Sequence, residues 1–313
     1  METVRIIGDF HLSDITPRSW KIPYFDNCLY ELREASKGVK NLIVLGDFFD
    51  KPTIPDAFKL RLVNELIDIA NHGCKIWSIV GNHDIIGYNM SESVFERTSI
   101  NLISSTSKAG GDYFNLITEP VEIGGITFVP YQGCRGSELI PAYDDKSVLL
   151  AHAFYNNPID DILNITKEQL ATLGYAVAAL GHDHEPHADT KSGKTIVVRP
   201  GSFTRSSSHA FNLNRLPTYV DLTLGTDGKI KVVHSQINSA RTPEEIFREE
   251  CFSKRNDSKI FESNLSQVFD VLAESKRDDT EFSLNSILVE VGADEKVIDY
   301  LRTIHRDSGV KWS

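Results

Sequence analysis

Five short polar clusters, each directly after an apolar run of strand length, constrain this chain more than any other feature. They are GDFH (8–11), GDFFD (46–50), GNHD (81–84), AHA (151–153) and GHDH (181–184). Four of the five begin with Gly, which lets the backbone turn sharply and pass close to a ligand. Ligand sites of α/β sheets gather at the carboxyl ends of strands, so we expect these distant clusters to meet in space.

The apolar runs alternate with stretches of helical spacing, which predicts an α/β fold. Helices are expected over 26–37 and 58–70, and helices should cover both faces of a sheet. Strands are expected over 4–8, 41–46, 75–81, 126–131, 147–152, 176–182 and 195–202, with a hairpin formed by 219–224 and 229–236.

The character of the chain changes near residue 241. A helix start follows, with Thr242 as N-cap, Pro243 at the first helical position and Glu245 two residues later. We therefore expect one domain over 1–240 and a small, mostly helical region over 241–313, serving as a cap or partner-binding segment.

Composition narrows the class of protein. The 313 residues carry a formal net charge of −11, which disfavours a general nucleic-acid-coating role unless bound cations invert the field at a site. No apolar run approaches the roughly 20 residues of a membrane span, and the N-terminus lacks a secretory layout. The cysteines, without CxxC spacing, are expected to be free thiols in a reducing cytoplasm: Cys28, Cys74, Cys134 and Cys251.

The residue types in the clusters point to metal chemistry. Carboxylate, imidazole and amide oxygen together suit a cation such as Mn²⁺, although Fe²⁺ and Zn²⁺ share such ligands. Two ions about 3.5–4 Å apart need a carboxylate between them and can hold both oxygens of an in-line phosphoryl displacement. The number of ligand-type residues fits two ions and exceeds what one needs.

The pattern DxH…GDxxD…GNHD…H…GHxH resembles the signature of the calcineurin-like metallophosphoesterases. The resemblance implies a two-sheet β-sandwich flanked by helices and a ligand set for two ions: Asp9, His11 and His184 for the first, Asn82, His152 and His182 for the second, and Asp47 between them. It also implies that His83 contacts the scissile phosphate and protonates the leaving oxygen. Asp84 would orient His83, and Asp50 would support the ligands without binding metal.

Within that superfamily, GDFFDKPTIP, IVGNHD, GYAVAALGHDHEPH and RPGSFTRSS resemble the SbcD-type double-strand-break repair nucleases over about 1–240. This resemblance implies a Mn²⁺-dependent DNA nuclease, with 3′→5′ exonuclease and single-strand endonuclease activity, acting with an SbcC-type ABC ATPase. It further implies homodimers built from helices near 56–71 and 91–99. Two features depart from that family: some members have His at the position of Asp50, and the region after 240 is shorter than its usual cap and tail.

Substrate contacts and the remaining histidines are less constrained. Arg205, in the Pro-Gly-Ser loop, is our main candidate for binding substrate, with further candidates Arg18, Lys51, Arg97, Arg135 and Arg199. His152 ends an apolar strand and could be a core histidine. His187 is expected in the loop after GHDH, and surface or packing roles are expected for His72, His209, His234 and His305.

Two other functions remain open from the sequence. One is a metallophosphoesterase acting on a small nucleotide or a phosphoprotein, which the acidic charge and the short C-terminal region favour. The other is a non-catalytic scaffold that keeps the fold to bind a partner, against which the complete ligand set argues.

Overall fold

A computed structural model describes residues 2–87, 90–134, 136–157 and 163–252. The chain divides into two compact units, Met1–Phe247 and Arg248–Ser313. The expected helix start is confirmed, since α6 (Pro243–Ile246) follows Thr242, whose N–H donates to Glu245 Oε2 at 2.6 Å. The predicted division at 240/241 stays a prediction, and the helical character expected beyond residue 252 lies outside the described residues.

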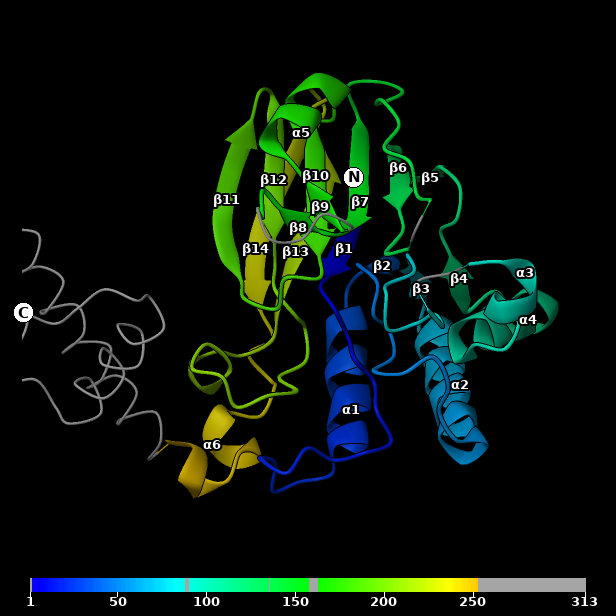
Figure 1. Ribbon diagram of the computed structural model, residues 1–313, viewed down its shortest axis with the longest axis vertical. Coiled ribbons are helices and arrows are strands. Elements are labelled where there is room, and N and C mark those ends of the chain that lie inside the picture. The colour runs from blue at the N-terminus through cyan, green and yellow to red at the C-terminus, as the bar shows by residue number, and fades with distance from the viewer. Residues whose placement is uncertain (1, 88–89, 135, 158–162, 253–313) are drawn as a thin grey trace, which may run out of the picture. The chain divides into compact units, whose positions relative to one another are not determined.

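Two six-stranded sheets form the framework of the described part of the first unit (Figure 1). The first sheet contains, in spatial order, β14 (Ile230–Gln236), β13 (Thr218–Leu224), β1 (Thr3–Ile7), β2 (Asn41–Val44), β3 (Lys75–Ser78) and β4 (Phe114–Leu116). The second contains β11 (His187–Ser192), β12 (Thr195–Arg199), β10 (Val177–Gly181), β7 (Ser147–His152), β6 (Ile126–Tyr131) and β5 (Val121–Ile123). A separate pair is formed by β8 (Phe154–Tyr155) and β9 (Asn164–Ile165).

The sheets pack face to face, which confirms the two-sheet α/β architecture. Alternate residues of β1, such as Val4 and Ile6, share one apolar cluster with alternate residues of β7, such as Val148 and Leu150. Side chains on successive strand residues point to opposite faces, so the intervening residues of β7 and β10 face outward. Leu149 and Leu180 meet Leu170 of helix α5 (Lys167–Leu173) there, which explains why these strands read as continuous apolar runs.

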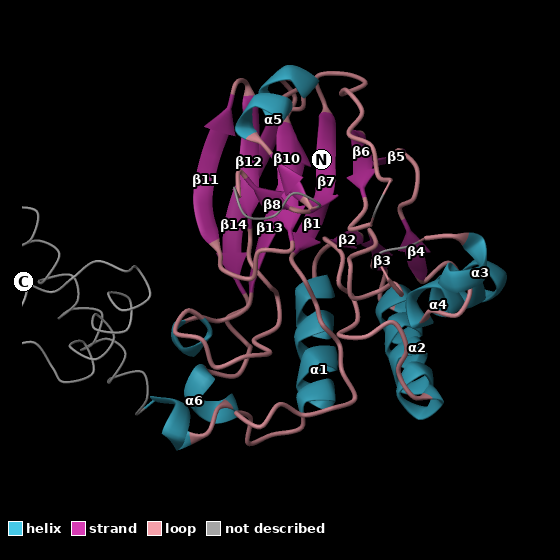
Figure 2. Cartoon of the chain, viewed as in Figure 1, coloured by secondary structure: helices cyan, strands magenta, loops and turns pink. Residues whose placement is uncertain are grey.

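Helices cover the outer face of each sheet. Against the first sheet, α1 (Tyr24–Ser36) contacts β2, α2 (Asp56–Asn71) contacts β3, and α4 (Ser99–Gly110) contacts β4. Figure 2 shows α1 and α2 side by side, and Phe25 and Phe58 join them with ring centroids 4.8 Å apart. The expectation of one sheet with helices on both faces is therefore wrong: one face of each sheet packs on the other sheet.

The central strands of both sheets run parallel, and all of them except β4 were expected in outline. β1, β2, β3 and β4 are parallel neighbours, and so are β6, β7, β10 and β12. Parallel pairing aligns their carboxyl ends at one edge of each sheet, where the polar clusters follow. Antiparallel strands close three of the four edges: β14, in the expected hairpin with β13, and β11 and β5 in the second sheet.

Some elements were not expected. The short strands β4, β5, β8 and β9 give little pattern, and β11 is polar because it lies at an edge with most of its side chains exposed. His187 begins β11 instead of lying in a loop. The helix expected over 91–99 is only the short α3 (Glu92–Phe95), while α4 begins at Ser99 after the N-cap Thr98. A short 3₁₀ helix, η1, covers Asn212–Asn214.

No helix within the described ranges is both long and apolar enough to cross a bilayer.

Candidate metal centre

The five clusters meet at the carboxyl edge of the two sheets. Asp9 and His11 follow β1, Asp47 follows β2, and Asn82 and His83 follow β3. From the second sheet come three histidines, His152 at the end of β7 and His182 and His184 after β10. Within the described residues, three overlapping groups have ligand atoms within 4.8 Å of one another: Asp9, His11 and His184; His11, Asp47 and His83; and Asp47, His152 and His182.

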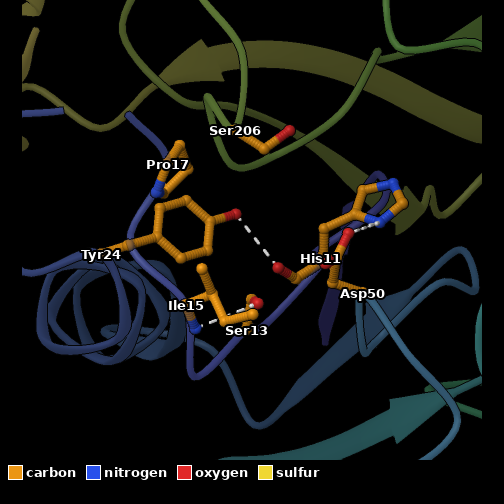
Figure 3. Close-up of a pocket in the computed structure, with 7 residues that line it drawn as sticks. All are labelled: His11, Ser13, Ile15, Pro17, Tyr24, Asp50 and Ser206. Atoms are coloured by element: carbon orange, nitrogen blue, oxygen red, sulfur yellow. Dashed lines mark hydrogen bonds and ion pairs between the residues drawn. The ribbon is translucent and has the colours of Figure 1, made fainter. Parts of the chain in front are cut away.

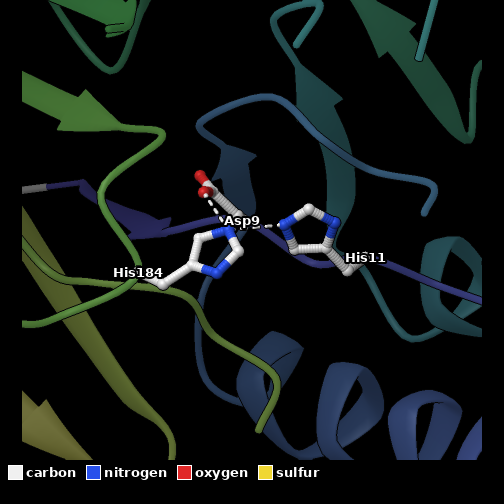
Figure 4. A group of neighbouring side chains, drawn as sticks. All are labelled: Asp9, His11 and His184. Atoms are coloured by element: carbon white, nitrogen blue, oxygen red, sulfur yellow. Dashed lines mark hydrogen bonds and ion pairs between the residues drawn. The ribbon is translucent and has the colours of Figure 1, made fainter. Parts of the chain in front are cut away.

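The first group brings the start of the chain against the GHDH turn (Figure 4). His11 and His184 point toward each other with their Nε2 atoms 2.8 Å apart, and His184 Nε2 lies 3.5 Å from Asp9 Oδ2. His11 Nδ1 is buried and has no hydrogen-bond partner. The two Nε2 atoms and the Asp9 carboxylate converge on one point, and imidazole and carboxylate ligands together suit a divalent cation.

Asp47 lies between the two outer groups. Its Oδ1 accepts a hydrogen bond of 2.8 Å from the backbone N–H of His83, which fixes the carboxylate. Its Oδ2 lies 3.3 Å from His152 Nε2 and 3.7 Å from His11 Nε2. One carboxylate oxygen within reach of ligands from both groups is the arrangement that a pair of ions requires.

In the group of Asp47, His152 and His182, hydrogen-bond acceptors face one another. His152 Nδ1 lies 2.9 Å from the carbonyl oxygen of Leu45, a bond that only an N–H can make, so the Nδ1 nitrogen carries a proton. His152 Nε2 then faces Asn82 Oδ1 at 2.8 Å and Asp47 Oδ2 at 3.3 Å, two oxygens that do not donate. A second proton or a metal cation is therefore needed among these three atoms. In metal sites, the imidazole that binds the ion commonly donates its other N–H to a backbone carbonyl, as His152 does here.

The pKa values of three buried side chains in the centre are shifted from their usual range. Burial raises the pKa of Asp9 to about 7, although the charge of His152 opposes the shift. Burial lowers the pKa of His11 to about 3, against the attraction of Asp47. Burial alone would also lower the pKa of His152, but the charge and hydrogen bond of Asp47 raise it to about 10. The group thus favours bound positive charge at its centre.

The local backbone explains why Gly and strained residues stand in the clusters. His11, Asp47 and His182 all have positive φ, at 45°, 45° and 80°, a conformation that costs free energy in non-glycine residues and is frequent at functional sites. A Cβ added to Gly81 would lie 2.1 Å from Asp47 Oδ1. Only a residue without a side chain lets the third cluster approach the central carboxylate.

His83 lies beside the metal-ligand groups but faces outward. Its side chain is exposed, its ring meets His11 edge-on at 5.0 Å, and its Nδ1 lies 2.9 Å from the backbone carbonyl oxygen of Asp50. Asp50 also brings a carboxylate oxygen within 3.9 Å of His11 Nδ1, so it lies beside a candidate ligand, and its supporting role stays a prediction.

The role expected for Asp84 is corrected. Its carboxylate is buried and accepts backbone N–H bonds from Phe48, Phe49 and Gly81, at 3.2, 2.9 and 2.9 Å. A carboxylate committed to three amides holds the GDFFD and GNHD turns together. The orienting contact of His83 is the Asp50 carbonyl, a backbone atom that residue identity does not reveal.

The role expected for Arg205 is wrong. This side chain is fully buried, where it pairs with the equally buried Glu31 and donates to the carbonyl of Arg241 at 2.9 Å. A guanidinium enclosed in this way cannot reach a substrate. The Pro-Gly-Ser loop instead supports the centre through its backbone: Ser202 N–H donates to the carbonyl of His184 at 3.0 Å, and Phe203 N–H to that of Asp9 at 2.8 Å.

The other candidate cations and histidines are more peripheral. Arg18, Lys51 and Arg97 are exposed, Arg199 is half-buried with its guanidinium 5.5 Å from the Tyr155 ring centroid, and Arg135 lies outside the described residues. His187 Nε2 pairs with Asp183 Oδ2 at 2.8 Å. His72, His209 and His234 are exposed, and His305 is not described. The four cysteines are free thiols.

Two positions that support the site were missed from the sequence. Leu45 acts only through its carbonyl, and Gly133 lies so close to His152 that an added Cβ would come within 2.6 Å of its Cδ2. Gly133 follows β6, an expected strand, so its place after a strand end was the one signal available in the sequence.

Comparison with known proteins agrees with the geometry at the level of the superfamily. Residues 3–227 match the model of the calcineurin-like phosphoesterase superfamily domain, a range that contains all five clusters. Among solved structures, the chain is similar to the crystal structure of a dimetal phosphatase from Danio rerio, with 14% sequence identity, 76% of this chain and 99% of that chain covered, and a TM-score of 0.45. No curated protein matches the sequence.

Proposed function

The chain belongs to the calcineurin-like phosphoesterase superfamily, and on that premise we propose that it is a Mn²⁺-dependent nuclease that hydrolyses DNA phosphodiesters. The observation that supports two-metal hydrolysis is the position of Asp47, because one of its oxygens lies near both His11 and His152. We propose 3′→5′ exonuclease and single-strand endonuclease activity, supported by the resemblance of the cluster regions to SbcD-type nucleases.

Seven side chains would hold the two ions. Asp9, His11 and His184 would bind one, Asn82, His152 and His182 the other, and Asp47 both. When bound, two divalent cations supply Lewis acidity to the phosphate and lower the pKa of the attacking water. The protein contributes fixed orientation: the Leu45 carbonyl sets the tautomer of His152, and the His83 N–H holds the Asp47 carboxylate.

His83 would supply the proton for the leaving oxygen. Its Nδ1 proton is engaged by the Asp50 carbonyl, so Nε2 is the nitrogen that can hold and release a proton toward the exposed side of the centre. General acid catalysis of this kind contributes about 10²–10⁴-fold to a rate.

The first experiment compares DNA cleavage by the wild type and two histidine variants. Purified protein with Mn²⁺ acts on end-labelled single- and double-stranded DNA, alongside His83→Ala and His187→Ala. We expect His83→Ala to lose about 10²–10⁴-fold in rate. His187→Ala should keep the wild-type rate because His187 pairs with Asp183 outside the ligand groups. Equal cleavage by wild type and His83→Ala would contradict the role of His83.

A second candidate is hydrolysis of a small nucleotide or a phosphoprotein. It is favoured by the net charge of −11 and by the burial of Arg205, which removes one cation from the set that could bind DNA. Cleavage of bis-p-nitrophenyl phosphate without cleavage of any DNA would support this candidate over the nuclease.

We further propose two partners: an SbcC-type ABC ATPase and a second copy of the chain. Support for the ATPase is the SbcD-type resemblance. Support for the homodimer includes exposed apolar side chains on two neighbouring helices, Leu60 and Ile67 on α2 and Leu102 on α4, which are 62%, 37% and 48% exposed. Co-purification of the two subunits would test the first partner.

A further inference from the structure

A pocket of about 290 Å³ opens beside the first metal-ligand group and is not used by any step above. Figure 3 shows four separate segments around it: the loop after β1 with His11, Ser13, Ile15 and Pro17; Tyr24 at the start of α1; Asp50 after β2; and Ser206. His11 belongs both to the pocket wall and to the candidate metal centre, so a group in the pocket lies next to any phosphate bound there.

The wall combines apolar faces with hydroxyl groups. Tyr24 is buried at the base, and its OH donates to the carbonyl of His11 or to Thr204 Oγ1, at 3.0 Å from each. Ile15, 55% exposed, and the half-buried Pro17 give apolar surface at the rim. Ser13 Oγ accepts from the N–H of Ile15 at 3.3 Å, which leaves its own proton to donate.

The charge of the pocket excludes a second phosphate. No Lys or Arg is among its lining residues, and Asp50 contributes a carboxylate that would repel an anion. Two exposed cations instead follow lining residues in the chain, Arg18 after Pro17 and Lys51 after Asp50. The pocket therefore suits a neutral group, and phosphates would lie outside it, near these two cations.

We propose that this pocket binds the nucleoside attached to the scissile phosphate, with its base against Ile15, Pro17 and Tyr24. The proposal rests on the phosphodiesterase function above and names its substrate class. A base has two flat apolar faces and a polar edge, and this wall offers apolar contact, hydroxyls and one acceptor carboxylate. A volume of about 290 Å³ suits one nucleoside and is too small for a folded peptide segment.

The direct test is a binding measurement that needs no turnover. Calorimetric titration of the Mn²⁺-loaded protein compares deoxyadenosine 5′-monophosphate with 2-deoxyribose 5-phosphate, which lacks the base. We expect the nucleotide to bind at least about tenfold more tightly, equivalent to about 1.4 kcal/mol. Ser206→Trp, which fills the pocket, and Ile15→Ser, which removes an apolar face, should bring the ratio close to one.

The matched control is Val233→Ser, a similar loss of an exposed apolar side chain on β14, which should keep the tenfold ratio. Equal affinity of the two ligands for the wild type overturns the proposal, and so does an unchanged ratio in both pocket variants.

A hydrolysis experiment separates this proposal from the proposed function. It compares the p-nitrophenyl esters of thymidine 5′-phosphate and of its abasic analogue, which share leaving group and scissile bond. We expect the nucleoside ester to have the higher kcat/KM, through KM, and the pocket variants to lose only that advantage. If neither ester is cleaved, the proposed function fails, while the affinity ratio still decides whether the pocket binds a nucleoside.

Discussion

His152 shows how single residues define this centre. The nitrogen that would bind a cation faces the oxygens of Asn82 and Asp47, and the Leu45 carbonyl prevents the ring from presenting the other tautomer. This arrangement of His152 Nε2 and the two oxygens is therefore stable only with a positive charge among them. Asp47 carries the negative charge that stabilises that cation, which makes it the side chain whose charge matters most.

Replacing Asp47 with Asn tests that claim. The substitution keeps the shape and removes the charge, so we expect binding of two Mn²⁺ ions per chain to fall to one or none. Metal content after equilibrium dialysis measures the effect. Asp189→Asn is the control, because Asp189 pairs with His234 on β14 and not with a candidate ligand. Two ions bound with unchanged affinity by Asp47→Asn would remove the shared carboxylate from the mechanism.

Asp84 is expected to act on stability. Its carboxylate satisfies three buried amides, so Asp84→Asn, which replaces one acceptor oxygen with a donor, should lower the free energy of unfolding by about 1–3 kcal/mol. Urea denaturation measures this change. His83→Gln, at an exposed neighbouring position, should leave stability unaltered and lower turnover. If Asp84→Asn keeps full stability but loses activity, Asp84 acts in catalysis after all.

At the scale of elements, the turns after the strands set the spacing of the ligands. Gly81 lies so close to Asp47 that a methyl group would come within 2.1 Å of both its amide nitrogen and Oδ1. We expect Gly81→Ala to weaken metal binding at least tenfold, measured by calorimetry. Gly110→Ala, at the end of α4 with open space around its Cα, is the matched control and should bind metal like the wild type. Normal binding by Gly81→Ala would show that the turn adapts.

The strands and the ligand clusters could be predicted from sequence because both depend on local pattern. β6 and β7 have the bounds expected, since their apolar runs end at polar residues. The roles of Arg205 and Asp84 could not be predicted. Arg205 pairs with Glu31, which is distant in the chain, and Asp84 binds three backbone amides, which residue identity does not reveal. β11 was missed because an exposed edge strand needs no apolar face.

At the scale of the whole molecule, the proposed dimer depends on the exposed apolar residues of α2 and α4. We expect the wild type to be dimeric by light scattering and Leu60→Glu to shift it to the monomer, because a charge buried in an apolar interface is costly. Tyr143→Glu is the control, since Tyr143 is 63% exposed on the loop before β7, where its N–H donates to Ser147 Oγ. A monomeric wild type at micromolar concentration would rule out this dimer.

The central claim is that strand ends from two sheets build one two-ion centre. Anomalous diffraction from crystals soaked in millimolar Mn²⁺ tests it most directly. We expect two peaks about 3.5–4 Å apart with Asp47 between them, one beside Asp9, His11 and His184 and the other beside Asn82, His152 and His182. Absence of any peak, or a single ion away from Asp47, would contradict the claim and favour a scaffold that retains the fold without its chemistry.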